Sequence, residues 1–322
     1  MQFRVKHKNR IVFFAAPFIL FIAFSVTHAA ETFMLGYTNH RGAKVPVPLG
    51  VDEGIFARHG IELKMAPVNP GTLGVPKLLA GEIDLFLGNS EPVVRAIALE
   101  KRNLAVIAHL GSEGFTLFSR PGITRIEDLR GKKIATSLDG ASVDRNTKKA
   151  LRKAGLDPEK DVTMVYTGFQ NSFDRLKLLA KGDVDATVAG SDALPELAND
   201  IDKVHPLLDL LEIGLAVSGA DISAEKNFID KKRQGLQRFI SALEESFRLA
   251  RSRPDLVRRT YERHLKLSNV TLDWMVKDYM TAKVPARPAP NPKVIEAYIE
   301  ELMLKKADVQ KDVNLYLDAS LF

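Results

Sequence analysis

The sequence contains no cysteine among its 322 residues. This absence excludes disulfide bonds, thiolate metal sites, a cysteine nucleophile and lipid attachment at cysteine. The sequence also lacks a G-x-S-x-G nucleophile elbow and a G-x-x-x-x-G-K-[ST] phosphate loop. The histidines beyond residue 30 show none of the paired spacings that metal sites use. We therefore expect no metal, no cofactor and no catalytic residues, and we predict that the protein is not an enzyme.

The first thirty residues have the layout of an export signal. Four basic residues precede an almost unbroken apolar run over residues 11–26, and small residues follow it. The run of 16 residues is shorter than the roughly 20 that a spanning helix needs, and Pro17 interrupts it. An uncleaved membrane anchor is the alternative interpretation. We expect cleavage near Ala29, which makes residues 1–29 a signal peptide and predicts a periplasmic protein.

The positive charge of the chain belongs mainly to this segment. Four of the 46 Lys and Arg residues lie there and none of the 40 Asp and Glu residues does, so cleavage lowers the formal charge from +6 to +2. A second basic stretch, residues 231–266, has the pattern of amphipathic helices whose apolar side chains face inward: Leu236, Phe239, Ile240, Leu243 and Phe247. We expect no nucleic-acid partner. Since no later run of 18 apolar residues exists, we expect a soluble mature protein.

Strand and helix patterns alternate along the mature chain, which predicts an α/β fold. Strands are expected at residues 33–37, 61–65, 83–87, 104–110, 115–118, 134–137, 162–166 and 184–189. Helices are expected at residues 47–60, 75–80, 92–101, 144–154 and 172–180. From about Ile222 the pattern is helical almost to the end, with helices at residues 230–252, 254–265, 272–281 and 292–306.

One pattern occurs twice. Residues 78–84 and 178–185 both read as a helix end, a glycine stop and a strand with an acidic entry, with Gly81 and Gly182 as the stops. The general alternative is that such junctions recur in any α/β protein. We interpret the repeat as two similar lobes, each with a small sheet.

Five motifs in order resemble those of the nitrate/sulfonate/taurine-type periplasmic solute-binding proteins of ABC importers. They are VPLGVDEGIFARHGIEL at residues 47–63, LAGEID at 79–84, IEDLRGKKI at 126–134, KGDVDA at 181–186 and VNLYLDASLF at 313–322. The resemblance implies a receptor that hands a small solute to the permease subunits of an ABC importer. It also implies a two-lobe periplasmic-binding-protein-like fold of type II, with two chain crossings and a helical C-terminal region.

We expect lobe I to comprise residues 30–114 plus 214–322, and lobe II to comprise residues 115–213. The crossings are expected near residues 111–114 and 211–214, where glycines can act as hinges. Closure on a ligand should then compact the protein, and we expect a monomer.

In open α/β sheets, ligands bind beyond the carboxyl ends of the strands, against helix N-termini that favour anions. Small polar residues recur at these junctions and are the predicted ligand-binding residues: Thr38, Asn39, Arg41, Asn69, Gly71, Thr72, Asn89, Ser90, Glu91, Gly140, Ser142, Gln170, Asn171, Ser191 and Asp192. Helix capping alone is the general alternative for each of them. Arg41 is a cation suited to a carboxylate, sulfonate or phosphate.

Acidic residues at the same junctions oppose an anionic ligand: Glu91, Asp139, Asp144 and Asp192. Either they point away, or the ligand has a cationic or hydrogen-bond-donating end, as a zwitterion does. Two other functions stay open from the sequence. One is an enzyme on the same fold, such as a pyrimidine-precursor synthase or a dehydratase, and the other is a sensory subunit of a membrane receptor.

Overall fold

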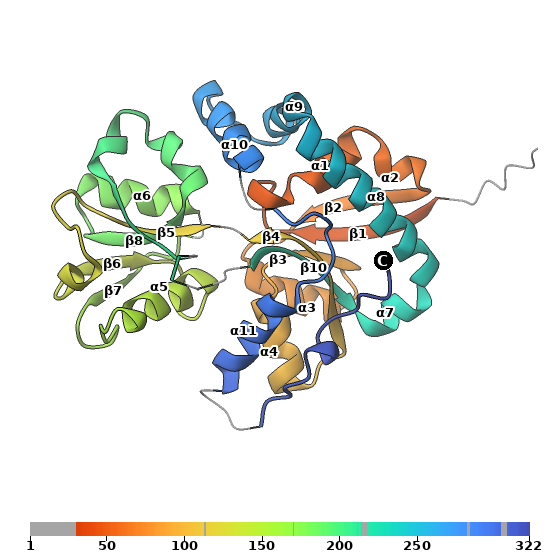
Figure 1. Cartoon of the computed structure of the whole chain (residues 1–322), viewed down its shortest axis with the longest axis horizontal. Coiled ribbons are helices and arrows are strands. Elements are labelled where there is room, and N and C mark those ends of the chain that lie inside the picture. The colour runs from red at the N-terminus through yellow and green to blue at the C-terminus, as the bar shows by residue number, and fades with distance from the viewer. Residues whose placement is uncertain are drawn as a thin grey trace, which may run out of the picture.

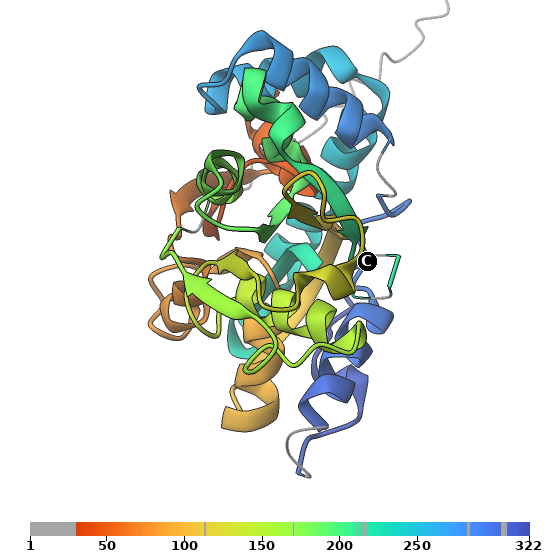
Figure 2. The same cartoon turned by 90° about the vertical axis from the view of Figure 1, so that its left-hand side faces the viewer.

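The structure is a computed structural model, which describes residues 30–112, 114–169, 171–210, 212–213, 215, 218–281, 284–303 and 308–322. The expected signal peptide lies outside these residues. The described strands form two five-stranded sheets, which lie side by side in Figure 1. Figure 2 turns the second sheet toward the viewer.

The first sheet has the order β2-β1-β3-β10-β4. Its strands are β1 (Glu31–Tyr37), β2 (Ile61–Pro67), β3 (Leu85–Gly88), β4 (Leu104–Ser112) and β10 (Ser218–Glu225). β1 pairs in parallel with β2 and β3, whereas β10 runs antiparallel between β3 and β4. The parallel strands direct their carboxyl ends toward one edge, where polar loops begin.

The second sheet repeats this plan with the order β7-β6-β8-β5-β9. Its strands are β5 (Phe115–Ser119), β6 (Lys133–Thr136), β7 (Thr163–Tyr166), β8 (Ala186–Gly190) and β9 (His205–Asp209). β6 is parallel to β7 and β8, and β5 is antiparallel to β8 and β9. The chain passes between the sheets twice, after β4 and before β10. The exact lobe boundaries at residues 114 and 214 stay a prediction.

The repeated sequence pattern occupies equivalent places in the two sheets. Helix α3 (Gly74–Leu79) precedes Gly81 and β3, and helix α6 (Ser172–Lys181) precedes Gly182 and β8. Both glycines have positive φ angles, 69° and 82°, which end the helices and favour a residue without a Cβ atom.

The remaining helices cover the faces of the sheets. Those before the last strand are α1 (Pro46–Asp52), α2 (Ile55–Arg58), α4 (Glu91–Glu100) and α5 (Ser142–Lys153). After β10 the chain forms α7 (Lys226–Lys231), α8 (Arg233–Ser252), α9 (Pro254–His264), α10 (Asn269–Thr281) and α11 (Pro292–Met303). Short 3-10 helices are η1 (Gly42–Lys44), η2 (Gly71–Leu73), η3 (Ile126–Leu129), η4 (Ser191–Lys203) and η5 (Val313–Leu315). None of the helices in the described ranges is long and apolar enough to cross a membrane.

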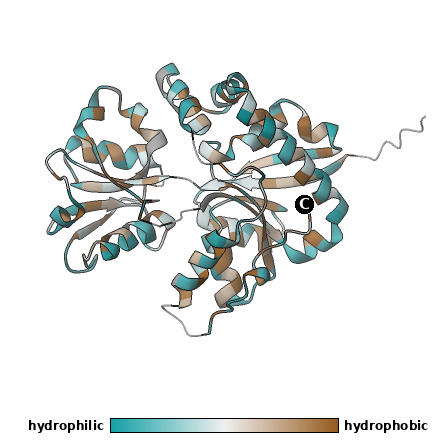
Figure 3. Cartoon of the chain, in the orientation of Figure 1, coloured by the Kyte–Doolittle hydropathy of each residue, from teal (hydrophilic) through white to brown (hydrophobic). Residues whose placement is uncertain are grey.

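Helix α8 packs as its apolar spacing predicts. The five inward residues expected from the sequence are all buried, with no more than 2% of each exposed: Leu236, Phe239, Ile240, Leu243 and Phe247. Burying each such side chain contributes about 1.5–3 kcal/mol. Figure 3 shows the corresponding pattern, with hydrophobic colour along the strands and hydrophilic colour on much of the outer helices.

Three local expectations were wrong. The chain does not turn helical at Ile222, because residues 218–225 form β10. The expected helix over residues 47–60 is divided at Gly54, whose φ angle is 66°. η4 and β9 were not expected at all.

The C-terminal motif lies along β4, where Val106 N donates to Tyr316 O at 2.8 Å and Asp318 N donates to Val106 O at 3.0 Å.

Candidate functional site

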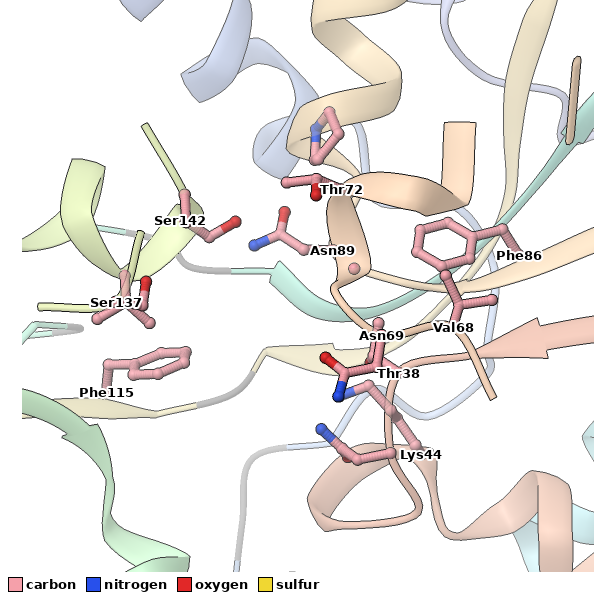
Figure 4. A pocket seen from close by; sticks show the side chains of 15 residues that line it. Thr38, Lys44, Val68, Asn69, Thr72, Phe86, Asn89, Phe115, Ser137 and Ser142 are labelled. Carbon is pink, nitrogen blue, oxygen red and sulfur yellow. The ribbon is translucent and has the colours of Figure 1, made fainter. Parts of the chain in front are cut away.

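A pocket of about 190 Å³ lies between the two sheets, and both contribute to its wall (Figure 4). The first half supplies the loop after β1, η1, the loop after β2, the end of β3 and the start of α4: Thr38, Asn39, Lys44, Val68, Asn69, Gly71, Thr72, Phe86, Asn89 and Pro92. The second half supplies β5, the end of β6 and the start of α5: Phe115, Ser137, Ala141, Ser142 and Val143. The site therefore lies at the carboxyl ends of the parallel strands, as the sequence predicts for this fold class.

Among the residues that the structure describes, the pocket wall has several hydrogen-bond donors and one lysine, and no Asp or Glu. Lys44 lines it and is only 1% exposed. The Ser137 side chain is 1% exposed and its hydroxyl has no hydrogen-bond partner. A buried unpaired hydroxyl is costly, so a ligand oxygen or donor at this point would be stabilised. Ser142 and Val143 belong to the first turn of α5, where backbone N–H groups lack intrahelical acceptors and favour an anion.

Asn89 is oriented by two hydrogen bonds to one atom. Its Oδ1 accepts from Glu91 N at 2.8 Å and from the Tyr298 hydroxyl at 3.3 Å. The Asn89 amide nitrogen therefore points away from α4 and toward Ser142 in the pocket (Figure 4). The direction of the Asn89 amide donor is therefore set by contacts within the protein.

Three of the four acidic residues at these junctions are ion-paired with basic side chains, and the side chain of the fourth, Asp192, is not described. Glu91 accepts from Arg145 and is 5% exposed. Asp144 accepts from Gly140 N at 2.9 Å and lies 3.0 Å from Lys148 Nζ. Asp139 lies 3.0 Å from the same ammonium group. Burial opposes the charged form of Lys148, but hydrogen bonds with Tyr166, Asp144 and Asp139 outweigh it and raise the Lys148 pKa. The cations thus offset the negative charge near the pocket.

Seven of the residues predicted from the sequence line the pocket: Thr38, Asn39, Asn69, Gly71, Thr72, Asn89 and Ser142. Others lie beside it and have structural contacts. Arg41 pairs with Glu196 at 2.6 Å, Gly140 O accepts from Arg145, and Asn171 caps α6 by accepting from Phe173 N at 2.9 Å. Ser90 and Glu91 are buried at the start of α4.

Three predicted residues have no described side chain. Gln170 lies outside the described residues. Ser191 and Asp192 begin η4, and only their backbone is described.

The sequence reasoning missed eight lining residues: Lys44, Val68, Phe86, Pro92, Phe115, Ser137, Ala141 and Val143. Ser137 could have been found, because it ends the predicted strand 134–137 and therefore lies at the carboxyl edge. Lys44 had no such signal, since an ordinary lysine is exposed. Within the described part of the chain, no group of three or more His, Asp and Glu residues could hold a metal ion.

His40 of the Thr38–Arg41 loop belongs to a cluster of aromatic and charged residues. The His40 ring lies 4.0 Å from that of Tyr37 and 4.8 Å from that of His264, centroid to centroid. His264 Nε2 is 3.1 Å from Asp52 Oδ1. Burial, followed by the neighbouring His264, lowers the pKa of His40 to about 4, although Asp52 opposes the shift. The His40 imidazole, which belongs to the loop beside the pocket, is thus neutral at neutral pH.

The chain is similar to one known protein family in sequence and to several solved structures in fold. A family model described as NMT1/THI5 like matches residues 44–256. No curated protein sequence is significantly similar to the chain. The periplasmic aliphatic sulphonate binding protein SsuA from Escherichia coli matches with a TM-score of 0.69 and 19% identity, covering 88% of this chain and 96% of that one.

Two further solved structures match to a similar degree. The alkanesulfonate-binding protein SsuA from Xanthomonas axonopodis pv. citri, bound to MOPS, has a TM-score of 0.68 and 18% identity, covering 91% of this chain and 99% of that one. The periplasmic nitrate-binding protein NrtA from Synechocystis PCC 6803 has a TM-score of 0.69 and 11% identity, covering 91% and 87%. These likenesses confirm the expected α/β fold of periplasmic binding proteins with two sheets.

Proposed function

The chain belongs to the NMT1/THI5-like family, and from this premise we propose that it is a periplasmic solute-binding protein that delivers a small organic anion to an ABC importer. The observation that carries the proposal is the wall of the pocket between the sheets. Its lining includes the buried Lys44, the unpaired Ser137 hydroxyl and the first turn of α5, and none of the described lining residues is Asp or Glu.

The mixture of polar and apolar side chains in the wall supports a ligand that is an anion with an apolar portion. Polar groups such as Asn69, Asn89 and Ser142 face the same space as Val68, Phe86 and Phe115 (Figure 4). Sulfonates combine a charged head that accepts several hydrogen bonds with a carbon chain. Two of the similar structures are named as binders of such compounds, and one of these holds MOPS.

The lining also supports binding without chemistry. Its described lining residues include no His, Asp or Glu, so Lys44 is the one ionisable side chain among them. A general acid–base pair, which most hydrolytic and lyase reactions use, would need a second such group. We propose that the solute leaves the pocket chemically unchanged.

Export and delivery complete the proposal. The N-terminal segment with the layout of a signal peptide supports a periplasmic location, and the likeness to SsuA and NrtA supports an importer as the partner.

The test is a thermal-shift screen followed by calorimetry on the mature protein, with sulfonates, nitrate, carboxylates, amino-acid-like zwitterions and pyrimidines. A ligand present at 100 times its Kd stabilises the fold by about 2.7 kcal/mol. Lys44→Gln should abolish the shift, whereas the exposed Lys64→Gln should preserve it. Mass spectrometry of the recovered ligand then separates binding from catalysis. If no anion binds, or if the solute is converted to product, the proposal is wrong.

A further inference from the structure

Two ion pairs join the two halves of the protein, one on each side of the pocket. Glu91, in the first turn of α4, pairs with Arg145 of α5. Arg41, in the loop before η1, pairs with Glu196 of η4 at 2.6 Å. The side chains of all four residues are at least four-fifths buried. Each pair thus connects the half that carries the first sheet with the half that carries the second.

The first pair is connected to the pocket wall on both sides. Arg145 also donates to Gly140 O, and its guanidinium lies 3.5 Å from the Ser142 hydroxyl that lines the pocket. On the other side, Glu91 N donates to Oδ1 of the pocket residue Asn89. The ion pair therefore links a residue beside one pocket wall to a residue beside the other.

Next to this pair, a second contact crosses between the halves. The ammonium of Lys149 on α5 lies 5.7 Å from the centre of the Tyr298 ring on α11. The Tyr298 hydroxyl donates to Asn89 Oδ1 at 3.3 Å. Cation–π contacts of this kind add to the attraction between the halves.

The other pair is connected to the pocket through one loop. Asn39 lines the pocket, and its Oδ1 accepts from Arg41 N at 3.0 Å. The Arg41 side chain then extends to Glu196, so a displacement of η4 would be transmitted to the pocket loop. Arg41 and Glu91, both predicted as ligand-binding residues, instead make contacts across the pocket.

We propose that Glu91–Arg145 and Arg41–Glu196 form an electrostatic clasp that holds the two halves closed over the pocket before any ligand arrives. A ligand would then cause little further compaction, in contrast to the expectation from the sequence. Partly buried charges attract each other strongly and are weakly screened by salt. When one partner is neutralised, the attraction across the pocket on that side is lost in the closed form, although Glu91 keeps Arg95 of its own helix at 3.8 Å. Neutralising one side should therefore favour the open form.

The clasp also has a consequence for ligand release, which rests on the proposed function. Opening must break both pairs before a solute can leave, so the pairs slow dissociation. The closed state in the absence of ligand does not depend on what the pocket binds. An experiment without ligand therefore separates the failure of the clasp from the failure of the proposed function.

The absence of cysteine makes the test direct. Lys64 and Lys160 are exposed and lie in different halves, so Lys64→Cys with Lys160→Cys provides two sites for spin labels. Pulsed electron resonance on the ligand-free mature protein then measures the distribution of distances between the halves. We expect a single closed population in the wild type. The ratio of closed to open molecules should fall about tenfold in Glu91→Gln, Arg145→Gln and Glu196→Gln.

The controls distinguish a clasp from general damage. Glu91→Asp keeps the charge and should keep most of the closed population. The double variant Glu91→Gln with Arg145→Gln should open the protein less than the sum of the single variants. Arg58→Gln removes an exposed pair with Glu245 within one half and should change nothing. Unfolding by urea verifies that each variant is folded. Identical distance distributions in the wild type and the single variants, or fully additive effects in the double variant, would overturn the proposal.

Discussion

His109 Nδ1 lies 2.7 Å from Asp221 Oδ1, and the two side chains are only 4% and 2% exposed. The residues face each other directly in the antiparallel pair of β4 and β10. These are the two strands of the first sheet that continue into the crossings between the halves. A buried polar link therefore joins both connections at their base.

Removing the acceptor from this link should destabilise the fold. In Asp221→Ala, the buried imidazole loses its partner, so we expect the free energy of unfolding to fall by about 3 kcal/mol. Asp221→Asn keeps an acceptor oxygen and should lose less. Urea unfolding followed by circular dichroism measures both. Asp230→Ala, which removes an exposed partner of Arg233, is the matched control and should change stability by no more than about 0.5 kcal/mol.

A methyl group at Gly74 should displace the Phe86 ring from the pocket wall. A Cβ atom there would stand 2.4 Å from Phe86 Cζ, so the ring, which is 1% exposed, would have to leave its packed position. We expect Gly74→Ala to cost about 1–3 kcal/mol, which is typical of overpacking. In a Phe86→Leu background the same substitution should cost clearly less. An equal cost in both backgrounds, measured by urea unfolding, would contradict the steric explanation.

The parallel strands of both sheets could be predicted because each is a short apolar run that ends at turn residues. β10 could not, although residues 220–224 are all buried within it. Ser218, Asp221 and Ser223 interrupt the run, and the burial of Asp221 is explained only by His109 on another strand. A contact between residues 112 positions apart is not visible in a local pattern.

The pocket was predictable to the extent that it follows strand ends. Thr38, Asn69 and Asn89 were found because small polar residues at these positions are recognisable in sequence. The roles of Arg41 and Glu91 were not, because their partners Glu196 and Arg145 lie in the other half. The direction in which a charged side chain points at such a junction depends on how the two halves pack. The sequence of a single loop does not contain this information.

Acidification should destabilise the protein partly through His40. Its pKa is 6.5 in an ordinary environment and about 4 in the fold, so the unfolded chain binds more protons between these values. The contribution of His40 to the free energy of unfolding is therefore largest above pH 6.5 and decreases as the pH falls toward 4. His40→Gln should flatten this dependence, whereas replacement of the exposed His205 by Gln should not. Urea unfolding at several pH values provides the measurement, and equal slopes in both variants would argue against His40.

A carboxylate introduced into the pocket at Asn89 should weaken anion binding without changing the fold. Asn89→Asp keeps the Oδ1 acceptor for Glu91 N and Tyr298, and replaces only the amide nitrogen that faces Ser142. At a separation of about 4 Å, repulsion between like charges is large enough to weaken binding of an anion about a hundredfold. Calorimetry with the anion found in the ligand screen measures the loss, and unfolding by urea should give a free energy close to that of the wild type. Asn314→Asp, far from the pocket, adds the same charge and should leave the affinity unchanged; tighter binding in Asn89→Asp would instead indicate a cationic ligand.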